Sequence, residues 1–109
     1  MRLRHKNFVS EIELNKSKTA AQIEKALPIS GNTEVWQEEI YFEIPVVADL
    51  ENGRERVESG DVTYWPNGRC FCVFFGKSQP ISAVTVIGKV KNNLDKFKEI
   101  RQGDRISLE

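Results

Sequence analysis

The segment 69–75 constrains the fold more than any other part of the chain. Residues alternate between the two faces of a strand, and here both faces are apolar. One face carries Phe71, Val73 and Phe75, and the other carries Cys70, Cys72 and Phe74. A strand of this kind must be covered on both sides. We expect one face to fill a barrel interior and the other to lie under a helix, either the one holding Ile23 and Leu27 or the one holding Phe97.

Short strand patterns occur along the rest of the chain as well. They cover 8–14, 40–44, 62–65, 83–90 and 106–108. Two amphipathic segments, 19–27 and 94–100, predict short helices, the first with Thr19 as N-cap, Gln22 completing a capping box and Pro28 as the stop. Asn52-Gly53 is a hairpin signal, and Pro66-Asn67-Gly68 predicts a tight turn. About eight strands with two short helices indicate a mainly β fold, a barrel or a sandwich.

Length and charge exclude several classes of protein. The 109 residues fit one domain, 1–109. There are 16 basic and 16 acidic residues, dispersed along the chain, so no basic stripe for nucleic acid is visible. No apolar stretch is long enough to span a membrane, and the N-terminal residues do not form a signal peptide. We therefore expect neither nucleic acid nor a membrane as partner.

The two cysteines indicate a reducing compartment. Cys70 and Cys72 are one residue apart, so they share a strand face, and a disulfide between them would be strained. Zinc normally takes four ligands, and the only histidine, His5, is far away in sequence and expected at the surface. We expect no metal, no cofactor, two buried free thiols and a cytoplasmic location.

A family resemblance becomes visible at Gly60–Gly68, followed by Cys70–Gly76. Together these segments resemble the small prokaryotic cyclophilin-like domains of unknown function. The segment from Thr19 to Pro28 is similar to the first helix of that family, and the segment from Trp36 to Phe42 to its next strand. The resemblance implies a compact closed β-barrel of about eight strands with two small helices, a reduced version of the cyclophilin barrel.

The comparison with true cyclophilins implies a changed site. Glu58-Ser59-Gly60-Asp61 is similar to their Gln-Gly-Gly-Asp, so Glu58 stands where their pocket glutamine stands. Phe74-Phe75 is similar to their paired phenylalanines, which gives Phe75 a role in lining the pocket. Their catalytic arginine corresponds to Leu50. A donor that acts only in the transition state is commonly worth roughly 3 kcal/mol, so the resemblance implies a barrel that binds but isomerises poorly.

The residues themselves suggest an aromatic cleft. Tyr64 and Trp65 precede Pro66 in a turn and form either a cleft wall or packing over the barrel end. Tyr41 should point outward, unlike Phe42. Arg69 follows the turn, where it either contacts an anionic ligand or is simply solvated. We expect Asp61 to brace its own turn.

Three functions remain open. The first is a module that binds a small molecule or a short peptide at Tyr64, Trp65, Phe75, Glu58 and Arg69, with no catalytic residues. The second is a weak or divergent peptidyl-prolyl cis-trans isomerase, which rests on the fold resemblance alone. The third is an interaction surface at Trp36 and Tyr41, so that the protein is a monomer or a weak homodimer.

Overall fold

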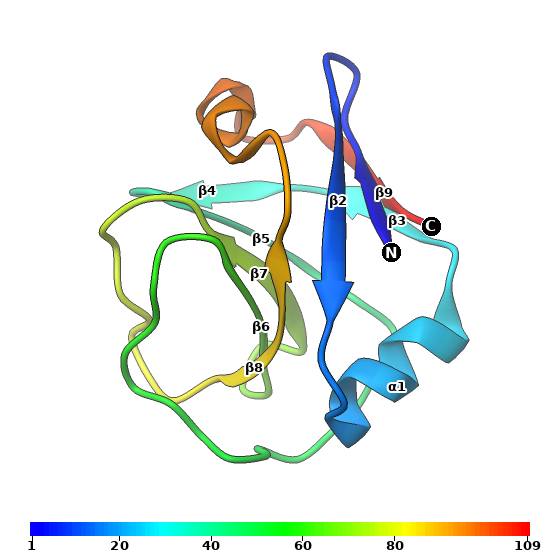
Figure 1. Cartoon of the computed structure of the whole chain (residues 1–109), viewed down its shortest axis with the longest axis vertical. Helices are drawn as coiled ribbons and strands as arrows, with labels where there is room; N and C mark the ends of the chain where they lie inside the picture. The colour runs from blue at the N-terminus through cyan, green and yellow to red at the C-terminus, as the bar shows by residue number, and fades with distance from the viewer.

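The computed structural model describes all residues, 1–109, and is mainly β. Nine strands are joined by one α-helix and one 3₁₀-helix (Figure 1). The strands are β1 (Arg2–Arg4), β2 (Val9–Leu14), β3 (Ile29–Asn32), β4 (Glu34–Trp36), β5 (Glu39–Glu43), β6 (Asp61–Trp65), β7 (Cys70–Phe74), β8 (Thr85–Val90) and β9 (Arg105–Leu108). The helices are α1 (Lys18–Ala26) and η1 (Leu94–Glu99).

The strands form one antiparallel sheet that curls into a nearly closed barrel. Their order is β3-β9-β1-β2-β8-β6-β7-β5-β4. The two outermost strands, β3 and β4, are consecutive in sequence and separated only by Thr33, so the chain itself joins the two ends of the sheet. The Thr33 amide donates to the carbonyl of Asp104, and its carbonyl accepts from the Gly103 amide. The expected cyclophilin-like barrel is confirmed.

The barrel interior holds the main core. Phe71, Val73 and Tyr64 are fully buried there, and the ring of Phe71 packs against Phe42 at 5.7 Å between centroids. Helix α1 covers one end of the barrel with Ala20 and Ile23, and η1 covers the other side with Phe97 (Figure 1). None of the helices is long and apolar enough to cross a membrane.

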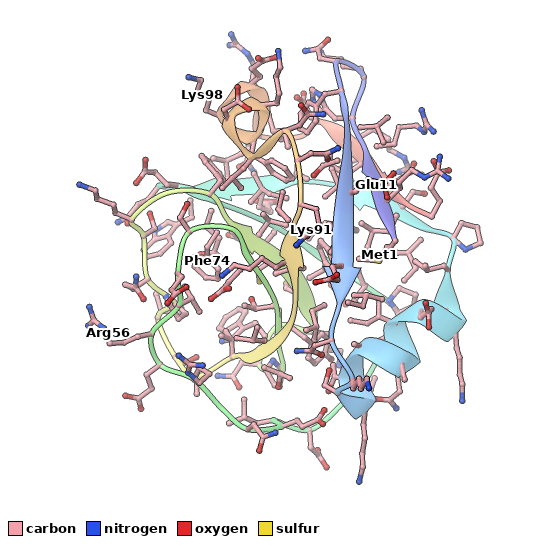
Figure 2. All side chains as sticks on the ribbon, viewed as in Figure 1. Met1, Glu11, Arg56, Phe74, Lys91 and Lys98 are labelled. Atoms are coloured by element: carbon pink, nitrogen blue, oxygen red, sulfur yellow. The ribbon has the colours of Figure 1, made fainter.

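The outer face of β7 is covered by loops, whereas the sequence predicted a helix. A second apolar cluster contains Val57, Cys70, Cys72, Phe74 and Val84. Val57 belongs to the loop between β5 and β6, and Val84 lies just before β8. Figure 2 shows Phe74 within the arc formed by these loops. The helices instead cover the barrel interior, which needs apolar cover at its open ends.

Helix α1 begins two residues earlier than predicted. Ser17 is the N-cap, and its hydroxyl accepts from the Ala20 amide at 3.1 Å, so Thr19 lies inside the first turn. The carboxylate of Glu51, from the distant loop 44–60, accepts from the amides of Lys18 and Thr19, both at 3.0 Å. These backbone donors, Lys18 first, lower the pKa of Glu51. The sequence pattern predicted a cap built from nearby residues alone, whereas the side chain of Glu51, distant in sequence, completes it.

Three further expectations about turns have different outcomes. Pro66–Gly68 is a tight turn that joins β6 to β7, as predicted. Asn52-Gly53 is not a hairpin, because it lies in the long loop 44–60 where only Arg54 pairs, with Val84. Asp61 does brace its turn, since its carboxylate accepts from the Glu58 amide at 2.8 Å.

His5 is buried, which corrects its expected place at the surface. It is 4% exposed, and its Nε2 lies 2.8 Å from the carboxylate of Asp104. Because the Asn7 amide donates to Nδ1, Nε2 carries the proton and donates to Asp104. This hydrogen bond is the main cause of the lowered pKa of Asp104. The pair ties the end of β1 to the start of β9.

Candidate functional site: an aromatic pocket on the outer face

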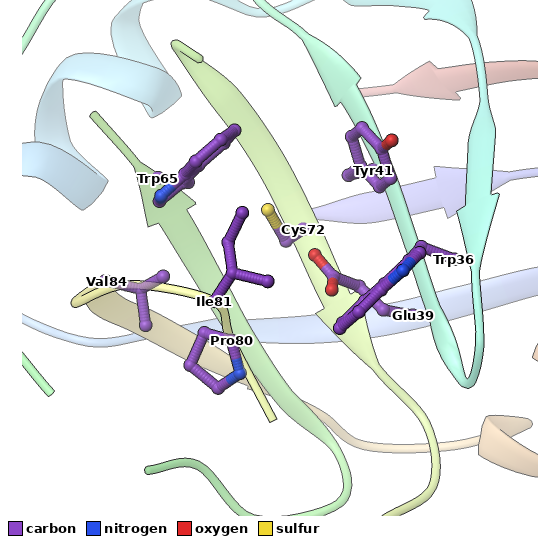
Figure 3. Close-up of a pocket in the computed structure, with 8 residues that line it drawn as sticks. All are labelled: Trp36, Glu39, Tyr41, Trp65, Cys72, Pro80, Ile81 and Val84. Carbon is purple, nitrogen blue, oxygen red and sulfur yellow. The ribbon is translucent and has the colours of Figure 1, made fainter. Parts of the chain in front are cut away.

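A pocket of about 180 Å³ opens on the outer face of the barrel beside β5, β6 and β7 (Figure 3). Six of the eight residues that line it are hydrophobic. They are Trp36, Glu39, Tyr41, Trp65, Cys72, Pro80, Ile81 and Val84. Trp36 and Trp65 are the only tryptophans of the chain. The pocket thus has three aromatic side chains and a single carboxyl group.

Strand register brings these side chains together. Trp36 on β4 lies directly opposite Glu39 on β5, and Tyr41 lies opposite Cys72 on β7. Directly opposite residues have Cβ atoms about 5 Å apart on the same face of a sheet. Glu39 and Tyr41 are two positions apart, so they also share this face. The floor of the pocket is therefore fixed by backbone pairing.

Trp65 forms a wall that is held at both edges. Its indole Nε1 donates to the Ser82 hydroxyl at 2.7 Å. The ring lies over Gly68, where an added Cβ would come within 2.7 Å of the indole carbon Cε3. Glycine at position 68 thus allows the indole to lie flat on the turn that follows β6, and Ser82 fixes its direction.

The loop 76–84, which carries Pro80, Ile81 and Val84, is anchored at both ends. The Ser78 hydroxyl accepts from the Glu38 amide at 2.8 Å. The side-chain amide of Gln79 bonds both backbone groups of Val57, at 2.8 and 3.1 Å. At the far end, Arg54 and Val84 exchange both backbone hydrogen bonds. Because the backbone on both sides of the lining residues is fixed, the pocket exists without a ligand.

Glu39 is the one ionisable carboxyl in the pocket, and it is 8% exposed. Burial raises its pKa to about 7, and only the thiol of Cys72 acts in the opposite direction. Figure 3 shows the carboxyl group beside Cys72, between the two tryptophans. No lysine, arginine or histidine lines the pocket. At neutral pH this carboxyl group therefore exists in both protonation states.

The thiols are unreactive in this setting. Cys70 and Cys72 are buried and unpaired, as expected. Burial is the main cause that raises the pKa of Cys70 to about 11 and the pKa of Cys72 well above its ordinary value. The thiolate is the nucleophile and the metal ligand, so neither sulfur is prepared for such chemistry. No group of three or more potential metal ligands comes together in the structure.

The five residues named as site candidates do not all meet. Only Trp65 lines the pocket. Tyr64 is fully buried in the barrel interior, where its hydroxyl donates to the Val46 carbonyl at 2.6 Å. Phe75 is half-buried and stacks on Phe97 at 6.4 Å. Glu58 is exposed and pairs with Lys89 at 3.3 Å, and Arg69 is exposed at the end of the tight turn.

Sequence reasoning missed Glu39 and the loop 76–84. Glu39 alternates with Ile40 and Phe42, a pattern typical of a solvent-facing residue. It is buried because the loop folds back over the outer face, and the sequence shows no sign of that path. Trp36 and Tyr41 were singled out as available aromatics, and the two-residue spacing between Tyr41 and Glu39 was the usable signal.

Comparison with known proteins agrees with the fold. The family model described as Cyclophilin-like matches residues 1–109. Among solved structures, the chain is similar to the solution structure of the hypothetical protein AF2241 from Archaeoglobus fulgidus, with 36% identity and a TM-score of 0.85. The match covers 99% of this chain and 91% of that one. The search of curated proteins found no match. The chain belongs to the cyclophilin-like family.

Proposed function

We propose that the protein is a binding module that takes a small molecule, or a side chain of a short peptide, in the aromatic pocket. The observation that carries this proposal is the concave site itself, with two tryptophans and a tyrosine around one polar group. Ligand sites are typically concave, mostly apolar and equipped with a few polar groups that set orientation. The volume of about 180 Å³ suits a small head group.

Preorganisation supports the same proposal. Ordering a loop or a rotamer-rich side chain during binding costs free energy. Here the Trp65 indole is already fixed by Ser82, and the loop is already fixed through Gln79 and Val84. The walls of the pocket are therefore ordered before a ligand binds.

The alternative, prolyl isomerisation, has less support. An apolar pocket of this size can accept a proline ring, but no arginine is among the residues that line it. Loss of amide resonance needs a donor that strengthens in the transition state. We expect proline peptides to bind weakly at most and to isomerise at the uncatalysed rate.

A fragment screen tests the binding proposal. Both tryptophans line the pocket, so tryptophan fluorescence reports on it. A titration followed by tryptophan fluorescence and by ¹H–¹⁵N NMR should shift the two indole signals and the amides near Ile81 together. Shifts scattered over the barrel, or no shifts for any fragment, would refute the proposal.

A matched pair of variants locates the binding. Ile81 is 72% exposed at the pocket, and Val47 is 69% exposed on a different surface. We expect Ile81→Ser to weaken fragment binding and Val47→Ser to leave it unchanged. In parallel, an isomerisation assay with a proline tetrapeptide should show no acceleration. Acceleration that Arg54→Ala or Arg56→Ala abolishes would instead establish the isomerase alternative.

A further inference from the structure

The charged residues in and beside the pocket are acidic. Glu39 lies within it, and Glu34 and Glu43 lie on the same outer face of β4 and β5. None of these three carboxylates takes part in an ion pair of the protein. The region therefore carries negative charge that the chain does not neutralise.

The aromatic side chains of the pocket also favour a positively charged ligand. The face of an aromatic ring carries partial negative charge, and it attracts a cation within about 6 Å of the ring centroid. Trp36, Tyr41 and Trp65 contribute three such rings to one pocket. Tryptophan is the most favourable ring for this contact, and the pocket contains both tryptophans of the chain.

The Cys72 thiol is the only hydrogen-bond partner that lowers the pKa of Glu39, and a buried carboxylate without a cationic partner carries a desolvation cost. The protein supplies no cation to Glu39, so the ligand is the remaining source of positive charge. From this arrangement, and resting on the proposed binding function, we infer that the pocket binds an alkylammonium group, with Glu39 as counter-ion and Trp36, Tyr41 and Trp65 as the surrounding aromatic cage. Such a head group occurs on free amines and on methylated lysine side chains.

This ligand chemistry predicts a definite pH dependence. Of the titratable groups on the surrounding strands, the Cys72 thiol on β7 hydrogen-bonds the carboxyl of Glu39, and the others are Tyr41 on the same strand, Cys70 on β7, and the carboxylates Glu34 and Glu43. With the pKa of Glu39 raised to about 7, its carboxylate form predominates only above neutral pH. A quaternary ammonium ion keeps its charge at every pH, so its affinity should rise as pH increases through neutrality. A bound cation favours the carboxylate and lowers the pKa of Glu39, so binding near neutral pH should release a proton.

A pair of isosteric ligands separates charge from shape. Choline is compared with dimethylbutanol, its neutral analogue in which carbon replaces the quaternary nitrogen, by tryptophan fluorescence and NMR at pH about 8. We expect choline to bind about tenfold more tightly than the alcohol, because only the cation gains the aromatic and carboxylate contacts. A peptide carrying trimethyllysine, against the same peptide with norleucine, shows whether a lysine side chain is also accepted.

Matched variants assign the charge to one residue. Glu39→Gln keeps the shape and removes the carboxylate, so it should lower choline affinity about tenfold and remove the rise with pH. The affinity for the neutral alcohol should not fall. Glu43→Gln is the control, since Glu43 is exposed on the same strand face and does not line the pocket. Trp36→Leu, which removes one aromatic ring of the cage, should weaken choline binding at least a few-fold relative to wild type.

The possible outcomes separate the ammonium inference from the proposed binding function. If choline and the alcohol bind the pocket with equal affinity, the ammonium inference is wrong while the binding function stands. If neither these ligands nor any fragment shifts the pocket signals, the binding function fails as well. Equal loss of choline affinity in Glu39→Gln and Glu43→Gln would remove Glu39 as the specific counter-ion.

Discussion

The hydroxyl group of Tyr64 forms the hydrogen bond that ties the loop after β5 to the barrel interior. It donates to the Val46 carbonyl at 2.6 Å and accepts from the Ala48 amide at 3.4 Å. Tyr64 is fully buried, and Val46 is 6% exposed. Tyr64→Phe keeps the ring and removes only the oxygen, so the Val46 carbonyl loses its donor in an apolar environment.

The cost can be estimated from this geometry. A buried acceptor left without its partner costs about 1–3 kcal/mol, and the 3.4 Å contact adds little because it is long. We expect Tyr64→Phe to lower the free energy of unfolding by about 1–2 kcal/mol. A domain of this length is stable by roughly 5–15 kcal/mol, and the change corresponds to a fall in Tm of roughly 4–10 °C.

Urea denaturation followed by circular dichroism measures the effect. The midpoint should fall while the slope m stays constant, since the surface exposed on unfolding is unchanged. Tyr41→Phe is the matched control: Tyr41, the only other tyrosine, is half-buried at the pocket and makes no hydrogen bond through its hydroxyl to the protein. It should change stability by less than about 0.5 kcal/mol. Equal costs for the two variants would refute the interior role of Tyr64.

Four further variants test the packing and the hydrogen bond between His5 and Asp104. Phe71→Ala should cost about 3–5 kcal/mol in urea denaturation, and Phe75→Ala clearly less, because Phe71 is fully buried and Phe75 half-buried; equal costs would contradict the core assignment. Gly88→Ala should cost about 1–3 kcal/mol, because its new Cβ would collide with the Glu13 carbonyl oxygen on β2; an unchanged midpoint would contradict that register. The lowered pKa of Asp104 means that its carboxylate stabilises the fold above about pH 4 and loses this contribution as pH falls through the lowered pKa. Asp104→Asn should therefore be less stable than wild type at pH 7, with the difference in urea midpoint shrinking at about pH 3; a constant difference would exclude the charge as its cause.

Much of the barrel could be predicted from local patterns. The two apolar faces of 70–74 indicated a central strand, which is β7, because alternation in a strand fixes which side chains share a face. The Pro66–Gly68 turn followed from residue types whose backbone preferences are local. The short strand β3 was not predicted, because its few residues include Gly31 and show no sustained alternation.

The site depended on contacts that no local pattern encodes. Tyr64 and Trp65 are adjacent in sequence and alternate faces, so one lies in the interior and the other in the pocket. Which one points inward was decided by the register of β6 with its neighbours.

The carboxyl group of Glu39 shows the same limit most clearly. Its alternation with Ile40 and Phe42 puts it on the same outward face as Tyr41, for which that direction was predicted. Only the tertiary structure decided that the outward face is covered there, by a loop more than 35 residues further along the chain. Alternation reports the side of a strand on which a residue lies, whereas burial depends on what later packs against that side.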